Sequence, residues 1–274
     1  MHSAGTLLLK WLRYYFSASN GRGHGIHSPF VFEFIEKVLN DRKEYPAYIQ
    51  IEQLREELLR NKTKLKIEDL GAGSSVNGGS RRSISDITKN AAKAKKWGQL
   101  LFRMAQYYKT ENILELGTSL GISAAYLASG NPQGKLITLE GANAIASIAA
   151  RNFNKLGLRN IELISGDFDN ALPTVIVSNQ LKPDELFDMV FVDGNHRKEP
   201  TLRYFEMLLP AMANASVIVF DDVHWSLEME EAWKRICDDP RVMLSVDLFF
   251  IGLVFFRPAF KVKQHFNIRH GILR

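Results

Sequence analysis

The feature that most constrains the fold is a run of apolar residues that leads directly into a turn with two spaced glycines. Residues 112–116 read Asn-Ile-Leu-Glu-Leu, and the turn that follows is Gly117-Thr118-Ser119-Leu120-Gly121. A segment of helix-forming residues begins at Ile122. Glycine lets a backbone approach a ligand closely, and the first turn of a helix offers N–H groups to an anion. The pattern predicts a strand, a ligand-binding turn and a helix in succession.

The spacing of the glycines indicates which nucleotide-like ligand the turn suits. Dinucleotide-binding turns usually read Gly-x-Gly-x-x-Gly, whereas three residues separate Gly117 from Gly121 in this chain. Glu115 precedes the turn, where its carboxylate can face the amino group of S-adenosylmethionine (AdoMet). The hydroxyls and amides from Ser119 to Ser123 can face the carboxylate of the same ligand. We therefore expect AdoMet rather than NAD.

Two further predicted strands place suitable groups at their carboxyl ends, where open α/β sheets bind ligands. Residues 136–139 lead into Glu140-Gly141, about twenty residues past the first glycine, where a carboxylate typically binds ribose hydroxyls. Residues 161–164 lead into Gly166-Asp167-Phe168, which offers a carboxylate and an aromatic face to adenine. Each acidic residue alone could be a solvated loop residue. The ordered set favours a binding site.

The glycine turn belongs to a longer series of motifs. Gly98-Gln99-Leu100-Leu101 precedes it, and Phe187-Asp188-Met189-Val190-Phe191-Val192-Asp193 and Val217-Ile218-Val219-Phe220-Asp221-Asp222-Val223-His224-Trp225 follow it. The series resembles class I AdoMet-dependent methyltransferases, most closely the cation-dependent O-methyltransferases that include the caffeoyl-CoA and catechol enzymes, over about residues 96–258. We therefore predict an α/β, Rossmann-like fold with a seven-stranded, mostly parallel sheet and an antiparallel closing strand. The expected reaction is methyl transfer from AdoMet to a hydroxyl of a small or conjugated acceptor.

The expected AdoMet-binding residues combine the turn with the strand ends. They are Glu115, Gly117, Thr118, Ser119, Gly121, Ser123, Glu140, Gly141, Gly166, Asp167, Phe168 and Asp193.

The predicted strands at residues 187–192 and 216–220 are joined by a helical segment, so a right-handed crossover makes them parallel. Asp193 on one strand end and Asp221-Asp222 on the other would then converge and offer oxygen ligands to Mg²⁺ or another divalent cation. The resemblance assigns a metal to these three positions, although Asp222 stands where the family usually has asparagine. In the alternative, no metal binds and Asp193 contacts the cofactor.

Two histidines are candidates for the general base, with Asp193 as the nearby carboxylate. His196 occupies the position where the family carries a lysine that deprotonates the substrate, and histidine suits this task near neutral pH. His224 is the competing candidate. Either histidine could instead be structural or solvated.

The chain length of 274 residues suits one principal core with an extension. We predict an N-terminal helical cap over residues 1–95, the AdoMet-binding domain over residues 96–258, and a basic tail over residues 259–274 that packs on the surface. A helix over residues 30–39 is expected after Ser28-Pro29, since serine caps helices and proline favours the first helical position.

Residues 67–74 imitate the glycine turn, but a Gly/Ser/Asn loop follows them rather than a helix. Residues 71–80 are therefore expected to form either a substrate loop or a surface turn.

Charge and composition limit the choice of partners and compartment. Residues 81–96 carry six basic side chains and one acidic one, which predicts either a solvated helix face or, as the less favoured alternative, a nucleic-acid docking surface for a nucleic-acid methyltransferase. A non-catalytic AdoMet-binding protein and a homodimer also stay open.

Cys237 is the only cysteine, and the longest apolar stretch, residues 242–256, contains Asp247 and is too short to span a bilayer. We therefore expect a cytoplasmic enzyme.

Overall fold

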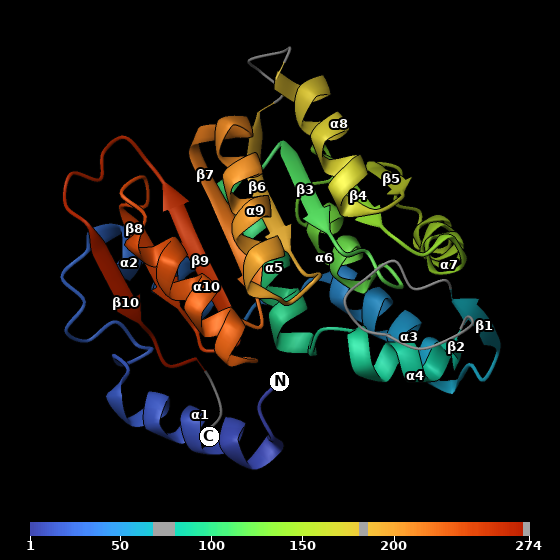
Figure 1. Cartoon of the computed structure of the whole chain (residues 1–274), viewed down its shortest axis with the longest axis horizontal. Helices are drawn as coiled ribbons and strands as arrows, with labels where there is room; N and C mark the ends of the chain where they lie inside the picture. The colour runs from blue at the N-terminus through green and yellow to red at the C-terminus, as the bar shows by residue number, and fades with distance from the viewer. Residues whose placement is uncertain (68–79, 181–185, 271–274) are drawn as a thin grey trace. The chain divides into compact units, whose positions relative to one another are not determined.

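The computed structural model describes residues 1–67, 80–180 and 186–270, shown as coloured ribbon in Figure 1. It divides into two compact units. The first unit comprises Met1–Asp41 and Leu186–Arg274, and the second comprises Arg42–Glu185. In the described residues, no helix combines the length and the apolar character needed to cross a membrane.

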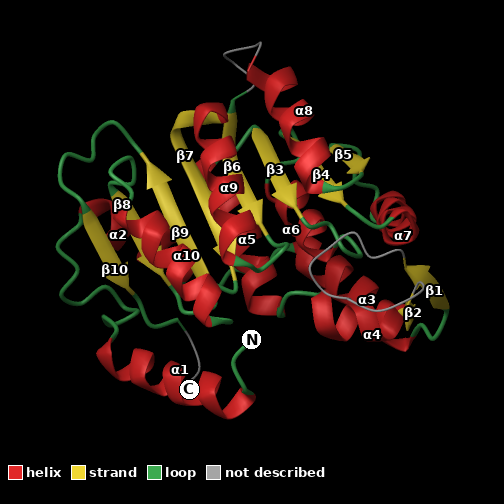
Figure 2. Cartoon of the chain, in the orientation of Figure 1, coloured by secondary structure: helices red, strands yellow, loops and turns green. Residues whose placement is uncertain are grey.

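The second unit is built around three parallel strands in the order β3-β4-β5 (Figure 2). They are β3 (Asn112–Leu116), β4 (Lys135–Glu140) and β5 (Ile161–Ser165). The connecting helices are α6 (Ile122–Gly130) and α7 (Asn143–Lys155), and α8 (Phe168–Gln180) follows β5. Ahead of these strands lie α3 (Pro46–Arg60), β1 (Lys64–Ile67), β2 (Ser80–Ser83), α4 (Ile84–Ala91) and α5 (Lys95–Tyr108). The strand–turn–helix prediction at the first glycine turn is confirmed by β3 and α6.

The first unit has five strands in the order β10-β8-β9-β7-β6. They are β6 (Phe187–Val192), β7 (Met212–Asp221), β8 (Leu244–Asp247), β9 (Ile251–Phe256) and β10 (Gln264–Asn267). Its helices are α1 (Ala4–Ser17), α2 (Pro29–Glu33), the π-helical η1 (Phe34–Leu39), α9 (Lys198–Leu208), the short η3 (Leu209–Ala211) and α10 (Leu227–Asp238). Strands β6 and β7 are parallel, as predicted, and β9 runs antiparallel to both β7 and β8.

The mostly parallel Rossmann-like architecture with an antiparallel closing strand is confirmed, but the predicted count of seven strands is wrong by one. Apart from β1 and β2, the described residues form eight strands, five in the first unit and three in the second, because residues 264–267 of the basic tail form β10 and pair in parallel with β8. The tail therefore does more than pack on the surface. Its strand has only four residues, and three of them, Gln264, His265 and Asn267, are polar, so its sequence gives little β signal.

The helix predicted over residues 30–39 is present as α2 followed by the π-helical η1, and the N-terminal segments add one feature that the sequence did not indicate. Ser28 caps α2 by accepting a hydrogen bond from the backbone N–H of Val31 at 3.4 Å. Strands β1 and β2 form an unpredicted antiparallel pair, in which Lys66 lies opposite Arg81. The basic run at residues 81–96 therefore starts on a strand and continues through α4 into α5, rather than forming one helix face. The imitation glycine turn and most of the predicted loop at residues 71–80 lie outside the described residues.

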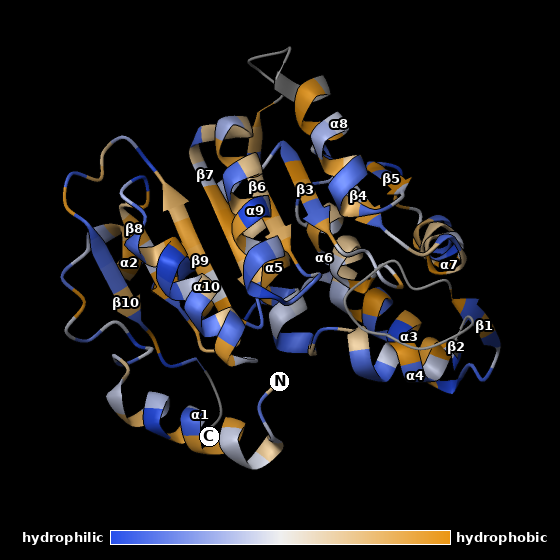
Figure 3. Cartoon of the chain, viewed as in Figure 1, coloured by the Kyte–Doolittle hydropathy of each residue, from blue (hydrophilic) through white to orange (hydrophobic). Residues whose placement is uncertain are grey.

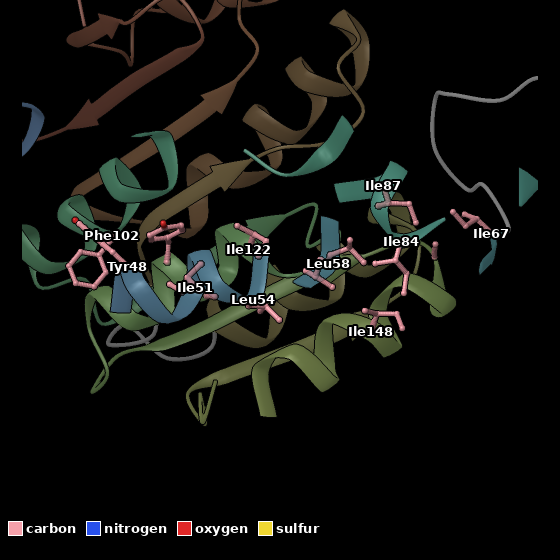
Figure 4. Close-up of a cluster of buried hydrophobic side chains, with 14 residues drawn as sticks. Tyr48, Ile51, Leu54, Leu58, Ile67, Ile84, Ile87, Phe102, Ile122 and Ile148 are labelled. Carbon is pink, nitrogen blue, oxygen red and sulfur yellow. The ribbon is translucent and has the colours of Figure 1, made fainter. Parts of the chain in front are cut away.

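Helix α3 packs by one stripe of side chains into a core within the second unit (Figure 4). Tyr48, Ile51, Leu54 and Leu58 recur at helical spacing and are all buried. They meet residues of β1, α4, α5, α6 and α7. A polar contact adds direction to this packing, because the Tyr126 hydroxyl of α6 donates to Glu52 Oε1 of α3 at 2.7 Å. This hydrogen bond and the shared core hold α3 against α6, the helix that follows the glycine turn.

Two isoleucines of α3 provide a matched test of this packing. Ile51 is 1% exposed and Ile49 is 60% exposed. We expect Ile51→Ala to lower the free energy of unfolding by roughly 2–5 kcal/mol, because it leaves a cavity in a packed core. Ile49→Ala removes the same atoms from the surface and should cost about 0.5 kcal/mol or less. Denaturant unfolding of both variants checks the prediction, and equal losses would contradict it.

Candidate cofactor and metal sites

The glycine turn between β3 and α6 contains three residues with left-handed backbone angles, and several of its backbone N–H groups donate hydrogen bonds within the protein. Gly117, Ser119 and Gly121 have φ angles of 107°, 47° and 85°. The N–H groups of Gly117 and Thr118 both donate to the carbonyl of Leu139 at 3.0 Å. A Cβ on Gly121 would lie 2.5 Å from the ring of Phe153, so the second glycine is required by packing as well as by its φ angle. The turn is held against β4 and cannot easily change shape.

Glu140, at the end of β4, braces this turn through its carboxylate. Its Oε2 accepts a hydrogen bond from the backbone N–H of Ser119 at 2.8 Å, and its Oε1 accepts one from Ala142 at 2.9 Å. Burial raises the pKa of Glu140, while the backbone N–H groups of Ala142, Ser119 and Gly141 oppose this shift. A carboxylate has about four acceptor positions. Its two oxygens can therefore accept further hydrogen bonds from a ribose while they hold the turn.

The start of α6 offers the predicted position for an anion. Gly121 is the N-cap and provides no side-chain hydrogen bond to the helix. The first amides of a helix have no acceptor within it, and the helix dipole adds positive character there. Ser123, in the first turn, is buried. The amide of Ser119 is not part of this position, because it donates to Glu140.

Glu115 lies in the interior of the second unit as a fully buried residue of β3. Its Oε2 accepts a hydrogen bond from the Thr138 hydroxyl at 2.6 Å, and Thr138 and Thr118 share a second hydrogen bond of 2.6 Å. This chain of contacts joins β3, β4 and the glycine turn. The predicted contact of Glu115 with an AdoMet amino group stays a prediction.

At the end of β5, the predicted adenine-binding residues form the start of α8. Asp167 Oδ1 accepts from the backbone N–H of Asp169 at 3.3 Å, and Oδ2 accepts from the Asn170 side chain at 3.0 Å. Gly166 donates its N–H to the carbonyl of Glu140 at 2.9 Å, which sets the end of β5 beside the end of β4. Phe168 is half-buried in the first turn of α8. Asp167 therefore has a local capping role, and its predicted role toward a ligand stays a prediction.

In the first unit, the structure brings Asp193, His196 and Asp221 together. One potential ligand atom from each residue lies within 4.8 Å of the others. Val192 pairs with Phe220 in the parallel register of β6 and β7, so the residues that follow or end these strands are neighbours. His196 Nε2 lies 3.5 Å from Asp193 Oδ1. The predicted convergence of these strand ends is thus present within this unit.

A left-handed residue in the loop after β6 accounts for the position of His196. Asn195 has a φ of 58°, and its side-chain amide donates to the Tyr204 hydroxyl of α9 at 2.9 Å. This contact fixes the turn between Asp193 and His196. Asp222 takes a different course: its φ is 53° and its N–H donates to the carbonyl of Phe250 at 2.7 Å. The group of potential ligands that the described residues form contains Asp193, His196 and Asp221, and Asp222 is not among them.

The chemistry of this group fits a divalent cation. Two carboxylates and a neutral imidazole supply oxygen and nitrogen ligands with a charge of −2, which a divalent ion balances. Asp221 is only 2% exposed, and two carboxylates this close repel each other, so a cation between them would be stabilising. Imidazole is a good ligand for first-row transition metals, whereas Mg²⁺ prefers oxygen alone. The set therefore favours Mn²⁺, Fe²⁺ or Zn²⁺ over Mg²⁺.

His224, the other predicted base, is held in a separate network of the first unit. Its Nε2 lies 2.7 Å from Asp247 Oδ2, its Nδ1 lies 3.5 Å from Glu230 Oε1, and its ring stacks on Phe249. Burial lowers the pKa of His224, but the contacts with Asp247 and Glu230 outweigh burial and raise it overall. The role of Asp247 in this network was not predicted from the sequence. A single aspartate within the apolar residues 242–256 was the available signal.

Comparisons with known proteins agree with this geometry. Residues 114–223 match the methyltransferase domain family. A catechol O-methyltransferase from Niastella koreensis is 35% identical over 128 residues, which is 46% of this chain and 55% of that protein. A catechol O-methyltransferase from Mycobacterium tuberculosis is 31% identical over 46% of this chain and 54% of its own length. The chain therefore spans about half the length of the curated relatives that it matches.

A solved structure extends the similarity in fold beyond the matched domain. An O-methyltransferase from Bacillus cereus in complex with SAH has a TM-score of 0.53 at 22% sequence identity, covering 82% of this chain and 97% of that one. At this identity the likeness concerns the fold. Together with the domain match and the relatives, it confirms the resemblance that the motifs carried. Over residues 114–223 this chain is therefore similar to a methyltransferase domain, and the relatives that it matches over about half of their length carry the name catechol O-methyltransferase.

Proposed function

We propose that this protein is an AdoMet-dependent O-methyltransferase that acts on a hydroxyl of a small or conjugated acceptor. The observation that carries the proposal is the glycine turn whose shape is fixed by Glu140 at the end of the neighbouring strand. The relatives with catechol O-methyltransferase names support the choice of a hydroxyl as the acceptor. AdoMet, when bound, would supply an electrophilic methyl group.

Each predicted binding residue of the second unit has a definite task in this proposal. The carboxylate of Glu140 accepts hydrogen bonds from ribose hydroxyls with the acceptor positions that the backbone leaves open. The first turn of α6 faces the carboxylate of the amino-acid part. Asp167 and Phe168 offer a hydrogen-bond acceptor and an apolar face to the adenine. The buried Glu115 keeps β3, β4 and the turn in register through Thr138.

Glu140→Gln tests this assignment. We expect AdoMet and S-adenosylhomocysteine to bind roughly ten- to a hundredfold more weakly, because hydrogen bonds to a charged group contribute about 1.5–3 kcal/mol. Isothermal titration calorimetry measures the change, and the parent should bind NAD far more weakly than either sulfur ligand. The matched control is Glu162→Gln, an exposed glutamate of β5 that pairs with Lys135. The absence of sulfur-ligand binding by the folded parent, or equal affinities for all three proteins, would contradict the proposal.

We further propose that Asp193, His196 and Asp221 bind a divalent cation. The donor set supports this proposal through its two converging carboxylates and adjacent imidazole. The residues would hold the cation, and the cation would contribute Lewis acidity toward an acceptor hydroxyl. In this assignment His196 replaces Asp222 in the predicted set of ligands.

Metal removal provides the test. We expect treatment with EDTA to abolish methyl transfer to catechol, and Mn²⁺ to restore it at lower concentration than Mg²⁺. Electron paramagnetic resonance of added Mn²⁺ should report binding to the parent and strongly weakened binding to Asp193→Asn. Asp238→Asn changes an exposed aspartate at the end of α10 and serves as the control. Full turnover in EDTA, with the same Mn²⁺ affinity in Asp193→Asn as in the parent, would rule out the site.

The two candidate bases differ in their surroundings, and this difference supports His196. His224 is engaged by Asp247 and Glu230 and stacked on Phe249, so we assign it the structural role of holding these elements together. His196 is more exposed and lies beside Asp193. We expect it to act in proton removal, either directly or as a ligand of the cation.

Paired alanine variants separate these roles. His196→Ala should lower kcat by roughly a hundredfold, the usual effect of losing a positioned base, while AdoMet affinity stays nearly unchanged. Mn²⁺ affinity measured on the same variant should fall as well, because we place His196 among the ligands; an unchanged affinity with a lower kcat would make it a base alone. If His196→Ala keeps the kcat of the parent while a folded His224→Ala loses it, His224 rather than His196 is the general base.

A further inference from the structure

Helix α1 carries an apolar face that is exposed in the part of the chain that the structure describes. No residue of α1 is buried, and Leu9 and Phe16 are 69% and 79% exposed. Leu8 and Leu12 are also exposed, and the four positions fall on one side of the helix at spacings of three or four residues. Figure 3 shows the apolar bands along α1. A helix of a soluble domain normally turns such a stripe toward the core.

The opposite side of α1 is fastened to the first unit by polar contacts. The Lys10 ammonium lies 2.8 Å from both carboxylate oxygens of Glu230. The Tyr14 hydroxyl contacts the carbonyl oxygens of Asp247 at 2.6 Å and Ile268 at 2.9 Å. Because these contacts fix the rotation of the helix about its axis, the leucines and Phe16 are held outward. The exposure of the apolar face is therefore built into the attachment of α1.

The surroundings of this face are basic. Residues 1–32 contain Lys10, Arg13 and Arg22 and no aspartate or glutamate, and residues 257–270 contain Arg257, Lys261, Lys263 and Arg269 and again no acidic residue. The two segments meet, since Ser19 forms a parallel bridge with Ile268 and the Arg269 guanidinium lies 5.3 Å from the centre of the Tyr15 ring. Arg13 is exposed in the same stretch of α1 as Leu9, Leu12 and Phe16. Lys10 is paired with Glu230, and the six other basic residues of these two segments still exceed the net charge of +5 of the whole chain.

We propose that α1 binds the surface of an anionic phospholipid bilayer and lies in its interface. Leucine and aromatic side chains on one face, with arginine and lysine around them, are the features of helices that bind in the plane of a membrane. The 14 residues of α1 are too few to span the hydrocarbon core, so the association is peripheral. Charge favours lipid over a second copy of this chain, because two copies facing each other through α1 would bring Arg13 and its basic neighbours together. This inference does not depend on the proposed methyl transfer.

Cosedimentation with vesicles tests the proposal on the whole chain of 274 residues. We expect the parent to bind vesicles of phosphatidylglycerol and phosphatidylcholine, and to bind vesicles of phosphatidylcholine alone much more weakly. The double variant Leu9→Ser/Phe16→Ser should have a partition coefficient into the anionic vesicles that is lower by about tenfold or more. Both substitutions remove apolar area that the membrane interface would bury. The matched control is Ile49→Ser/Leu227→Ser, which changes two exposed apolar residues elsewhere. Circular dichroism confirms that each variant is folded.

A charge variant separates the electrostatic contribution from the apolar one. Arg13→Glu/Arg269→Glu should weaken binding to the anionic vesicles and reduce its dependence on salt, because fewer cations meet the headgroups. Arg60→Glu changes an exposed arginine of α3 and should have no effect. Equal binding by the parent and Leu9→Ser/Phe16→Ser would overturn the proposal. A parent that ignores anionic vesicles, and whose dimer is lost in the same variant, would show instead that the face joins two copies of the chain.

Discussion

The hydrogen bonds between Glu140 and the glycine turn are the constraint on which the candidate cofactor site depends. One carboxylate accepts from Ser119 on the turn and from Ala142 beyond β4, while Leu139 receives the amides of Gly117 and Thr118. The left-handed backbone of the turn is thus stabilised by contacts with β4 and the residues that follow it. A site formed in advance loses less conformational entropy on binding, so this arrangement favours affinity. The residue to which we assign the ribose-binding role is also the residue that shapes the turn.

A second carboxylate organises the first unit in a comparable way. Asp247 ends β8, where it accepts hydrogen bonds from the indole of Trp233 and the backbone N–H of Phe249 and contacts His224. A buried carboxylate is costly unless it is hydrogen-bonded, and these partners meet that requirement. Tyr14 of α1 binds the carbonyl of the same residue. Asp247 therefore joins α10, the loop before β9 and α1, and the orientation of the exposed apolar face follows from it.

The sequence predicted those parts of the fold that local patterns determine. The glycine turn, the strands after it and the capped helix at Pro29 were found because apolar periodicity and special backbone positions leave a direct signal. The pair of β1 and β2 was missed because lysine and arginine dominate its residues, and β10 because its four residues gain their order from pairing with β8. The partners of His224 were missed for a related reason. Glu230 and Asp247 lie on different elements, and only tertiary structure brings them to one ring.

The candidate metal site shows why strand motifs and loop geometry carry different information. Parallel pairing of β6 and β7 makes Asp193 and Asp221 neighbours, and the apolar pattern of the strands was enough to predict this. The third ligand depends on two left-handed loop residues, Asn195 and Asp222. One turn places His196 beside the aspartates, and the other commits the Asp222 amide to Phe250. Since imidazole and carboxylate select different metals, the loops rather than the strands decide which cation the candidate site of this chain would bind.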